Sequence, residues 1–266
     1  MAANKERLDV ALVRRGLAPS RERARALIMA GQVFLGEKML DKPGTLVPLD
    51  SECRLAETPD ELKYVSRGGL KLEKALHDFD LRPAGLIALD VGASTGGFTD
   101  CLLRNGASKV YALDVGRAQL AWTLRNDPRV VVMEQTNIRH VTSLPEPIQC
   151  AVIDVSFISL RLVLPPIVPL LVPGAWIAAL IKPQFEAGKT EVDRGGGIIS
   201  DPAVHARVLS ELQTWIPAHT PLRVIGVIDS PIHGRDGNKE FLMHLRLDEQ
   251  SHPASFQSPH ASEHAS

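Results

Sequence analysis

The sequence has few cysteines and almost no net charge, and both shortages argue against whole classes of protein. Its three cysteines, Cys53, Cys101 and Cys150, are odd in number and far apart. This pattern argues against a disulfide framework and a zinc site, so we predict no metal site and a reducing, cytoplasmic environment. The formal net charge is −1, so affinity for nucleic acid has to come from local clusters of basic residues.

Unbroken apolar runs are also missing. The first ten residues, MAANKERLDV, contain no apolar core of a secretion signal. The most membrane-like stretch is residues 164–181, LPPIVPLLVPGAWIAALI, and its four prolines would break a spanning helix. We interpret it as a proline-rich connection followed by a buried strand, and we expect no membrane partner. The 266 residues are enough for one large core and an appendage.

The most informative stretch is residues 86–99, LIALDVGASTGGFT. Its apolar start is typical of a strand buried on both faces, and Asp90 ends that strand. A turn of small residues follows, made of Gly92, Ala93, Ser94, Thr95, Gly96 and Gly97. A helix then begins at Phe98 and ends at Asn105-Gly106. Such a turn binds ligands that need close backbone approach, although it also occurs as an ordinary tight turn.

The acid at the mouth of this turn narrows the choice of ligand. The spacing is not that of the dinucleotide pattern GxGxxG, and the Asp90 carboxylate would repel a pyrophosphate. It suits a cationic ligand without phosphate, such as S-adenosylmethionine, whose amino group and sulfonium are positive. We therefore expect S-adenosylmethionine as the cofactor.

Apolar runs recur along the larger part of the chain with a regular spacing. They begin near residues 86, 109, 130, 151 and 175, at intervals of 23, 21, 21 and 24 residues. This spacing is typical of βα units and predicts an α/β fold, a Rossmann-like parallel sheet with helices on both faces. The runs at residues 223–229 and 240–246 are close enough to pair as an antiparallel edge.

Polar residues follow the predicted strands at the edge where ligands of open α/β sheets bind. Asp114 stands where an acid commonly accepts the ribose hydroxyls of an adenosine. The stretch from Glu134 to Asn137 follows the third strand, within reach of an adenine edge. Asp154 and Lys182 follow the fourth and fifth strands. For each residue alone, a solvated polar strand end is the better explanation, but the set together favours a site.

Lys182 emerges from the apolar run 177–181, where an ammonium group is poorly hydrated. A second cation is available just upstream of the first strand, at Lys71. Asp154 would orient one of these ammonium groups, and Glu240 could supply a further acceptor. A surface ion pair between Lys71 and Glu240 is the alternative. The glycine-rich residues 192–202 we interpret as a flexible loop over the entrance.

Residues 5–58 have the pattern of a separate small α+β module. Five arginines lie within twelve positions, opposed there only by Glu22: Arg14, Arg15, Arg21, Arg23 and Arg25. Guanidinium groups suit phosphates, although an arginine-rich helix is often just a solvated face. The stretch LDVALVRRGLAPSRERARALIMAGQVFLGEK resembles the alpha-L RNA-binding motif of S4-type domains. That resemblance implies a module that binds structured RNA by its shape and phosphates.

Seven further motifs occur in a fixed order: SRGGLKL, LDVGASTGGFTDCLL, ALDVGRAQL, DVSFISL, LIKPQFE, VDRGGGII and GNKEF. With them the chain resembles the TlyA (hemolysin A) family of ribosomal RNA 2′-O-methyltransferases, whose catalytic domain is FtsJ-like. The resemblance covers about residues 5–247. It implies a catalytic Lys-Asp-Lys-Glu tetrad that matches Lys71, Asp154, Lys182 and Glu240, and a cofactor loop at 92–97.

The resemblance also implies a division of the chain and a set of partners. We expect an S4-like RNA-binding domain at 5–58, a linker at 59–70, a methyltransferase domain at 71–248 and a disordered tail at 249–266. Arg67, in the linker, joins the predicted RNA-binding residues. The implied partner is ribosomal RNA or a ribosomal subunit, methylated on a ribose, with cytidine as the expected nucleotide. No obligate protein partner is evident.

Three other functions fit parts of the pattern. A membrane-active hemolysin conflicts with the missing signal and the proline breaks. A ribosome-assembly factor without catalysis conflicts with the complete tetrad and loop. A base N-methyltransferase would carry an Asn/Asp-Pro-Pro-aromatic run after the fourth strand, where this chain has DVSF.

Overall fold

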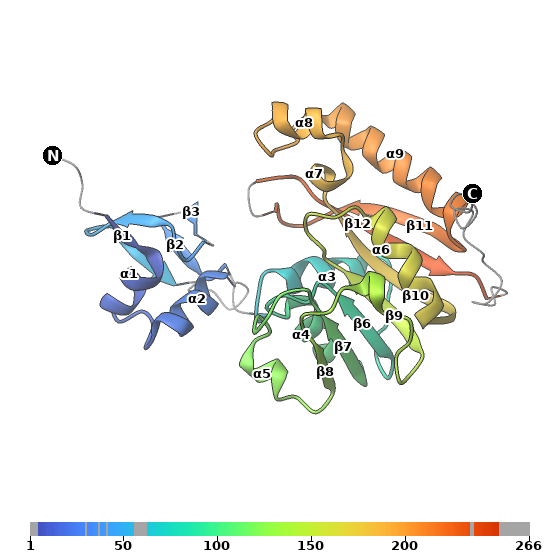
Figure 1. Ribbon diagram of the computed structural model, residues 1–266, viewed down its shortest axis with the longest axis horizontal. Coiled ribbons are helices and arrows are strands. Elements are labelled where there is room, and N and C mark those ends of the chain that lie inside the picture. Colours follow the sequence, from blue (N-terminus) through green and yellow to red (C-terminus); the bar gives the residue numbers. More distant parts are fainter. Residues whose placement is uncertain are drawn as a thin grey trace, which may run out of the picture.

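The computed structural model describes residues 5–29, 31–36, 38–40, 42–55, 63–234 and 237–249. Figure 1 shows a small N-terminal module and a larger module built around one sheet. Most of the predicted disordered tail and the first third of the predicted linker, residues 59–62, lie outside the described residues. No helix within the described ranges has both the length and the apolarity that a membrane crossing requires.

The N-terminal module packs two helices against two small antiparallel sheets. Its elements are β1 (Lys5–Arg7), α1 (Leu8–Arg14), α2 (Arg21–Met29), β2 (Val33–Leu35), β3 (Lys38–Met39), β4 (Leu46–Pro48) and β5 (Cys53–Leu55). β1 pairs with β4, and β2 lies between β3 and β5. Leu8, Leu12 and Ile28 are fully buried between the helices and the strands. The spacing of leucines along α1 therefore produces a small core of its own.

The larger module alternates strands and helices. Its elements are α3 (Gly68–Asp78), β6 (Ile87–Val91), α4 (Gly97–Arg104), β7 (Lys109–Leu113), α5 (Trp122–Arg125), β8 (Val130–Met133), η1 (Ile138–His140), β9 (Ile148–Ile153), α6 (Leu160–Ile167), η2 (Val168–Leu170), β10 (Leu171–Ile181), α7 (Pro183–Glu186), α8 (Lys189–Arg194), α9 (Pro202–His219), β11 (Leu222–Asp229) and β12 (Phe241–Leu247).

The seven strands lie in the order β11-β12-β10-β9-β6-β7-β8. All neighbours are parallel except β12, which runs antiparallel to both β10 and β11. The predicted α/β fold with a mostly parallel sheet is confirmed, as is the antiparallel pair at its end. The chain steps outward from β6 to β7 and β8, and then returns to β9 on the other side of β6. This reversal places a ligand crevice at the carboxyl ends of β6 and β9.

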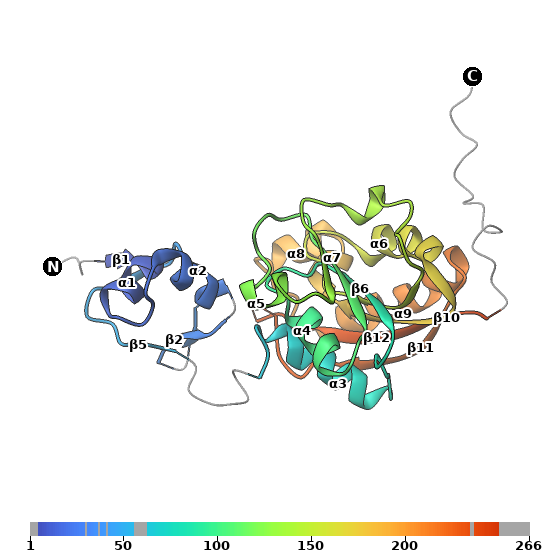
Figure 2. The same cartoon turned by 90° about the horizontal axis from the view of Figure 1, so that it is seen from below.

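Apolar helices cover both faces of the sheet (Figure 2). α3 and α4 bury Leu72 and Leu102 against one face, while α6 and α9 bury Leu164 and Leu212 against the other. Burial on both faces explains why β6, β9 and β10 are near-continuous apolar runs rather than alternating ones. The sheet is therefore a rigid support for the residues at its carboxyl edge.

Two predictions of local structure differ from the fold. The connection expected from residue 164 begins as a helix, because α6 includes Pro165 and Pro166 before it ends at Ile167. The buried apolar face of α6 offsets the backbone hydrogen bonds that the two prolines cannot donate. Part of the predicted linker is also packed: Tyr64 is 4% exposed, and the Val65 amide donates to Asp100 at 2.9 Å.

Candidate active site

Two lysine–carboxylate pairs meet at the carboxyl edge of the sheet. Lys71, in the first turn of α3, pairs with Glu240 just before β12, with 2.5 Å between Nζ and Oε2. Lys182, directly after β10, pairs with Asp154, which follows β9, with 2.5 Å between Nζ and Oδ1. All four residues line one cavity. The fold therefore brings together four side chains that span 169 positions of the sequence.

Both pairs are largely shielded from water. The side chains of Lys71 and Lys182 are each 11% exposed, and those of Glu240 and Asp154 are 3% and 22% exposed. Lys182 also donates to Ser156 Oγ at 2.9 Å. Each ammonium group is therefore held in place by a fixed carboxylate, at a point where it can position a substrate oxygen or exchange a proton with it.

The glycine turn forms a cradle beside these pairs. Its Gly92 has φ +89°, and a β-carbon there would lie 2.5 Å from the carbonyl oxygen of Asp154. Only glycine fits where the ends of β6 and β9 approach this closely. Seven of the nine predicted cofactor residues line the cavity: Gly92, Ala93, Ser94, Thr95, Gly97, Asp114 and Asn137. The other two, Asp90 and Gly96, are not among the lining residues.

Asp90 lies beneath the cradle rather than at its surface. It is fully buried and accepts a 2.6 Å hydrogen bond from Thr99 Oγ1. Burial raises the pKa of the Asp90 carboxyl to about 7, and the nearby charge of Asp154 adds to the rise, while the Thr99 hydrogen bond opposes it. Its Oδ1 atom has no hydrogen-bond partner within the described parts of the chain. Asp90 therefore faces the interior of the module beneath the cradle and does not line the cavity.

The acids after β7 and β8 organise the loops around the cradle. Asp114 accepts hydrogen bonds from the Ser94 and Gly116 amides, at 2.8 and 2.7 Å. Glu134, which the sequence placed near an adenine edge, instead accepts from three amides of residues 118–120 and from Arg125. Burial raises the pKa of Glu134, but these donors outweigh it and lower the pKa. Asn137 caps η1 through the Arg139 amide.

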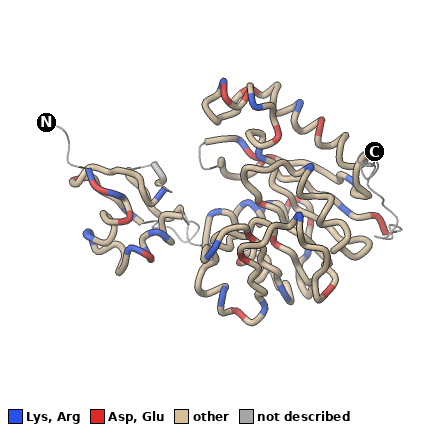
Figure 3. The backbone as a smooth tube through the Cα atoms, in the orientation of Figure 1, with Lys and Arg blue, Asp and Glu red and all other residues tan. Residues whose placement is uncertain are grey.

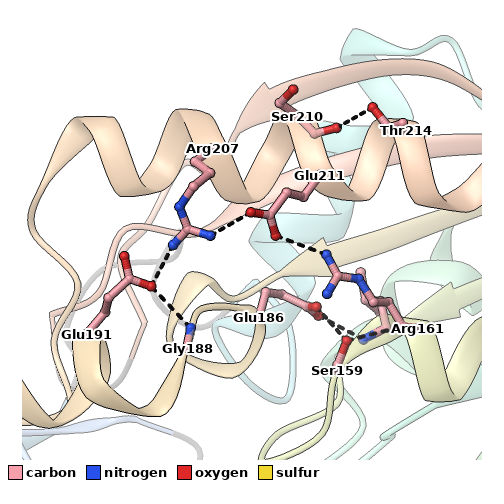
Figure 4. Close-up of polar contacts among 10 residues, drawn as sticks. Ser159, Arg161, Glu186, Gly188, Glu191, Arg207, Ser210, Glu211 and Thr214 are labelled. Atoms are coloured by element: carbon pink, nitrogen blue, oxygen red, sulfur yellow. Dashed lines mark hydrogen bonds and ion pairs between the residues drawn. The ribbon is translucent and has the colours of Figure 1, made fainter.

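A chain of polar contacts ties the loop after Lys182 to the rest of the module (Figure 4). Glu186, at the end of α7, accepts from Ser159 Oγ at 2.6 Å and from the Leu160 amide at 2.8 Å. Since Ser159 and Leu160 begin α6, this contact joins the loop after β9 to the loop after β10. Arg207 of α9 bonds Glu191 of α8, so the helix before the glycine-rich stretch is also anchored.

The glycine-rich stretch itself is tied down. Asn238, which is 2% exposed, accepts from the Ile199 amide at 2.8 Å and donates to the Gly197 carbonyl at 3.0 Å. Because Asn238 stands two positions before Glu240, this loop is linked to the strand end that carries a member of the site.

Comparison with known proteins places this architecture in a family. An FtsJ-like methyltransferase model matches residues 64–247, and an S4 domain model matches residues 6–53. The chain is 46% identical over 251 residues to the 16S/23S rRNA (cytidine-2′-O)-methyltransferase TlyA of Mycobacterium tuberculosis, covering 92% of this chain and 91% of that protein. It is 41% identical to hemolysin A of Brachyspira hyodysenteriae, covering 90% and 99%.

The chain belongs to the FtsJ-like methyltransferase family. The predicted resemblance is confirmed for both modules. A solved structure of a candidate hemolysin from Streptococcus thermophilus superposes on this methyltransferase with a TM-score of 0.72 and 45% identity, covering 93% of this chain and 90% of that one. The relatives of this chain therefore carry two kinds of name, methyltransferase and hemolysin.

In the S4 module, the predicted RNA-binding arginines fall into two groups. Arg14 and Arg15 lie against Glu6, at 2.5 and 3.8 Å, and both donate to the Leu49 carbonyl. Arg21 and Arg25 lie against Asp9, at 2.9 and 3.2 Å. Both opposing acids precede the arginine-rich window, and Figure 3 shows acidic residues among the basic ones in this module.

The remaining two arginines differ in their surroundings. Arg23 is exposed on the first turn of α2, whereas Arg67 is half-buried and lines the cavity of the methyltransferase module. Arg67 is the N-cap residue of α3, the helix that carries Lys71.

Among the cavity-lining residues that the sequence analysis did not single out are Ser156, Phe157 and Phe185. Ser156, the second partner of Lys182, stands two positions after Asp154, so the rule of polar strand ends could have included it. Phe157 is 90% exposed with φ +63°, and its ring lies 5.0 Å from that of Phe185. The sequence predicts neither the exposure of Phe157 nor its backbone conformation, because an aromatic residue next to a buried strand is normally expected to pack in the core.

The contact at Gly92 leads to a first prediction. We expect Gly92→Ala to lower the free energy of unfolding by about 2–5 kcal/mol, combining positive-φ strain with overpacking against the Asp154 carbonyl. Gly85→Ala is the matched control, since Gly85 has φ +75° but no atom within 4 Å of an added β-carbon, and should cost about 1 kcal/mol. Denaturant titration followed by circular dichroism measures both. Equal losses would contradict the contact.

The raised pKa of Asp90 leads to a second prediction. Because its pKa is higher in the folded state (about 7) than the ordinary value of 3.8, folding favours the protonated form, and the contribution of Asp90 to stability falls as pH rises from 4 to about 7. Asp90→Asn mimics the protonated carboxyl at every pH. We expect the melting temperature of this variant to exceed that of the wild type by a margin that grows as the pH rises from 5 to 8. A constant difference between pH 5 and 8 would contradict the assignment.

Proposed function

We propose that this protein methylates ribose 2′-hydroxyl groups of ribosomal RNA, with cytidine as the target nucleotide and S-adenosylmethionine as the donor. The observation that carries the proposal is the convergence of the pairs Lys71–Glu240 and Lys182–Asp154 in the cavity that the glycine cradle lines. The Mycobacterium tuberculosis relative is named as an rRNA (cytidine-2′-O)-methyltransferase, which supports this choice of substrate. With ribosomal RNA as the substrate, the methylation would take place in the cytoplasm.

The residues of the cradle fit the proposed cofactor. S-adenosylmethionine supplies a methyl group bound to a positively charged sulfur. The carboxylate of Asp114 lines the cavity, where it suits ribose hydroxyls and would repel a pyrophosphate. Gly92 leaves a cradle that a β-carbon would fill. In this proposal the 92–97 turn holds the amino-acid part, Asp114 accepts from the ribose, and Asn137 lies on the adenine side.

The four polar residues would act on the ribose 2′-hydroxyl. A hydroxyl is a weak nucleophile, so its attack needs a group that accepts or shares its proton. We assign this role to the uncharged amine form of Lys182 Nζ, which Asp154 and Ser156 hold in place. This amine would take up the hydroxyl proton as the oxygen gains the methyl group. Lys71, fixed by Glu240, would position the hydroxyl oxygen. Alignment of the reacting atoms by these rigid groups would supply most of the rate.

RNA would be held by both modules. Residues 5–58 would bind structured RNA through Arg14, Arg15, Arg21, Arg23 and Arg25, while residues 71–248 carry out the transfer and Arg67 contacts RNA beside the cavity. The exposed ring of Phe157 offers a stacking face for a nucleobase at the cavity rim. The match to an S4 domain model supports the division of labour.

Mapping of 2′-O-methyl groups tests the function directly. Ribosomal RNA from cells with and without this protein is digested and analysed by mass spectrometry, and purified ribosomal subunits are then incubated with the protein and S-adenosylmethionine. We expect at least one 2′-O-methylcytidine that depends on the protein in both assays. Methylation confined to base nitrogens, or to no position, would refute the proposal.

The proton-accepting role of Lys182 makes a sharper prediction. Lys182→Ala should lower the turnover of methyl transfer by about 10²–10⁴-fold. Lys182→Arg should be similarly inactive, because arginine keeps the charge but does not release its proton. The assay is transfer of a tritiated methyl group to ribosomal subunits. The matched control is Lys74→Ala, which removes a surface lysine of α3 paired with Asp78. An active Lys182→Arg enzyme would reduce Lys182 to a positive charge.

The stacking role of Phe157 is separable from catalysis. Phe157→Ala should raise the KM for ribosomal subunits about 5- to 100-fold, since base stacking on an aromatic ring contributes about 1–3 kcal/mol. Phe157→Leu, which keeps apolar bulk without a ring face, should be as weak as alanine, whereas Phe157→Tyr should bind normally. Calorimetry with S-adenosylmethionine should show unchanged affinity in all three. A fully active leucine variant would contradict stacking.

A further inference from the structure

We propose that Asp9 is a positioning residue for RNA binding, which gathers Arg7, Arg21 and Arg25 into one phosphate-binding cluster. The inference rests on the proposed RNA substrate and adds to it a residue of opposite charge. It also adds Arg7, which lies outside the arginine-rich window. We call Arg7, Arg21 and Arg25 together with Asp9 the Asp9 cluster.

The geometry of the Asp9 cluster is that of one carboxylate shared by three guanidinium groups. Arg7 donates to both oxygens of Asp9, from Nε at 3.0 Å and from Nη2 at 3.2 Å. Arg21 Nη2 and Arg25 Nε donate to Oδ2 at 2.9 and 3.2 Å. Arg7 ends β1, and the other two arginines belong to α2. The carboxylate thus brings cations from two elements to one point.

The carboxylate of Asp9 is buried, whereas the three arginines around it are exposed to solvent. The side chain of Asp9 is 0% exposed, whereas those of Arg7, Arg21 and Arg25 are 45%, 54% and 52% exposed. Burial alone would raise the pKa of Asp9, but hydrogen bonds from the three arginines lower it well below its usual range. Three positive charges against one negative charge leave a local excess of +2. An approaching anion therefore meets cations without meeting the carboxylate.

Unused donors remain on every arginine of the cluster. Within the described residues, Nη1 of Arg7, Nε and Nη1 of Arg21, and both Nη atoms of Arg25 make no hydrogen bond. Arginine forks bind phosphates well when their orientation is fixed, because less side-chain entropy is then lost on binding. Asp9 fixes that orientation before RNA arrives. The spare N–H groups then suit adjacent phosphates of an RNA backbone.

The neighbouring Arg15 shows, by contrast, a guanidinium group that is turned inward. Its side chain is only 16% exposed, and its Nη2 donates to the Pro48 and Leu49 carbonyls and to Ser51. These bonds fasten the end of α1 to β4 and the residues that follow it. In the described part of the chain, no arginine of the Asp9 cluster donates to a backbone carbonyl. Its arginines therefore retain their capacity for an external anion.

The proposal reverses the expectation from charge alone. Removing a negative charge from a basic surface should strengthen RNA binding if only net charge matters. If Asp9 positions the arginines, its removal should weaken binding, because the three guanidinium groups lose their common acceptor and repel one another. The direction of the change therefore separates the two accounts.

The experiment compares Asp9→Asn with Asp50→Asn in the full chain. Asp50 is an exposed residue of the same module with no described partner, so both variants remove one charge at nearly constant shape. The probes are fluorescein-labelled double-stranded RNA and purified ribosomal subunits, followed by anisotropy and filter binding over a range of salt concentrations. We expect Asp9→Asn to bind about tenfold more weakly than the wild type, with a shallower dependence on salt. Asp50→Asn should bind as well as the wild type or more tightly.

A double-mutant cycle tests whether Asp9 acts through Arg7, and circular dichroism shows whether each variant is folded. Arg7→Gln and the double variant Asp9→Asn/Arg7→Gln are measured alongside, with circular dichroism as the check on folding. If Asp9 acts through Arg7, the double variant should lose less affinity than the two single losses combined. Calorimetry with S-adenosylmethionine should give wild-type affinity for every variant, since the cofactor cradle lies in the other module.

The outcomes are distinguishable. Failure of the wild-type chain to bind either RNA probe would overturn the proposed function together with this inference. RNA binding by folded Asp9→Asn that equals or exceeds that of Asp50→Asn would overturn this inference alone. If Asp9→Asn unfolds the S4 module, Arg7→Gln decides: a folded Arg7→Gln variant with wild-type affinity and salt dependence would overturn it as well.

Discussion

The site depends on a single close approach between two strand ends. Where β6 and β9 stop, the backbone of Gly92 lies so near the carbonyl oxygen of Asp154 that no side chain fits between them. This contact makes the cofactor cradle and the acid that holds Lys182 neighbours in space. The distance between the two is set by the sheet rather than by mobile loops. A cavity that must align a donor and an acceptor benefits from such a fixed separation.

Much of the fold could be predicted from the sequence, because a few simple rules relate the spacing of apolar runs to a parallel sheet. Regular spacing of apolar runs implies βα units, and parallel strands necessarily place their carboxyl ends at one edge. That reasoning alone predicted Asp154 and Lys182 as neighbours. Lys71 and Glu240 were only candidates on that reasoning, with a surface ion pair as the alternative. The family resemblance was needed to assign them to the site, since a helix upstream of the sheet and a turn before β12 share no local pattern.

Other features could not be read because they depend on contacts between distant residues. Asp90 was expected to face the ligand, yet packing against Thr99 buries it, and no pattern in LDVGAST reports which way the carboxyl turns. Glu134 was expected near an adenine, but the amides of a preceding loop occupy it. Helix α6 also continues through Pro165, which local helix propensity would not predict. Burial of its apolar face outweighs the loss of the backbone N–H groups at the prolines.

The two modules solve a shared electrostatic problem in the same way. Each must present cations to a polyanion or to its hydroxyl groups, and free lysine or arginine side chains would be too mobile to do so precisely. In the methyltransferase module, Glu240 and Asp154 each hold one ammonium group. In the S4 module, Glu6 holds two guanidinium groups and Asp9 holds three.

The net charge of the sequence does not reveal this arrangement. Each acid cancels one positive charge in the sum, while it fixes the direction of the cations around it. Near-neutral composition is therefore compatible with an ordered basic surface, provided that the acids lie underneath it.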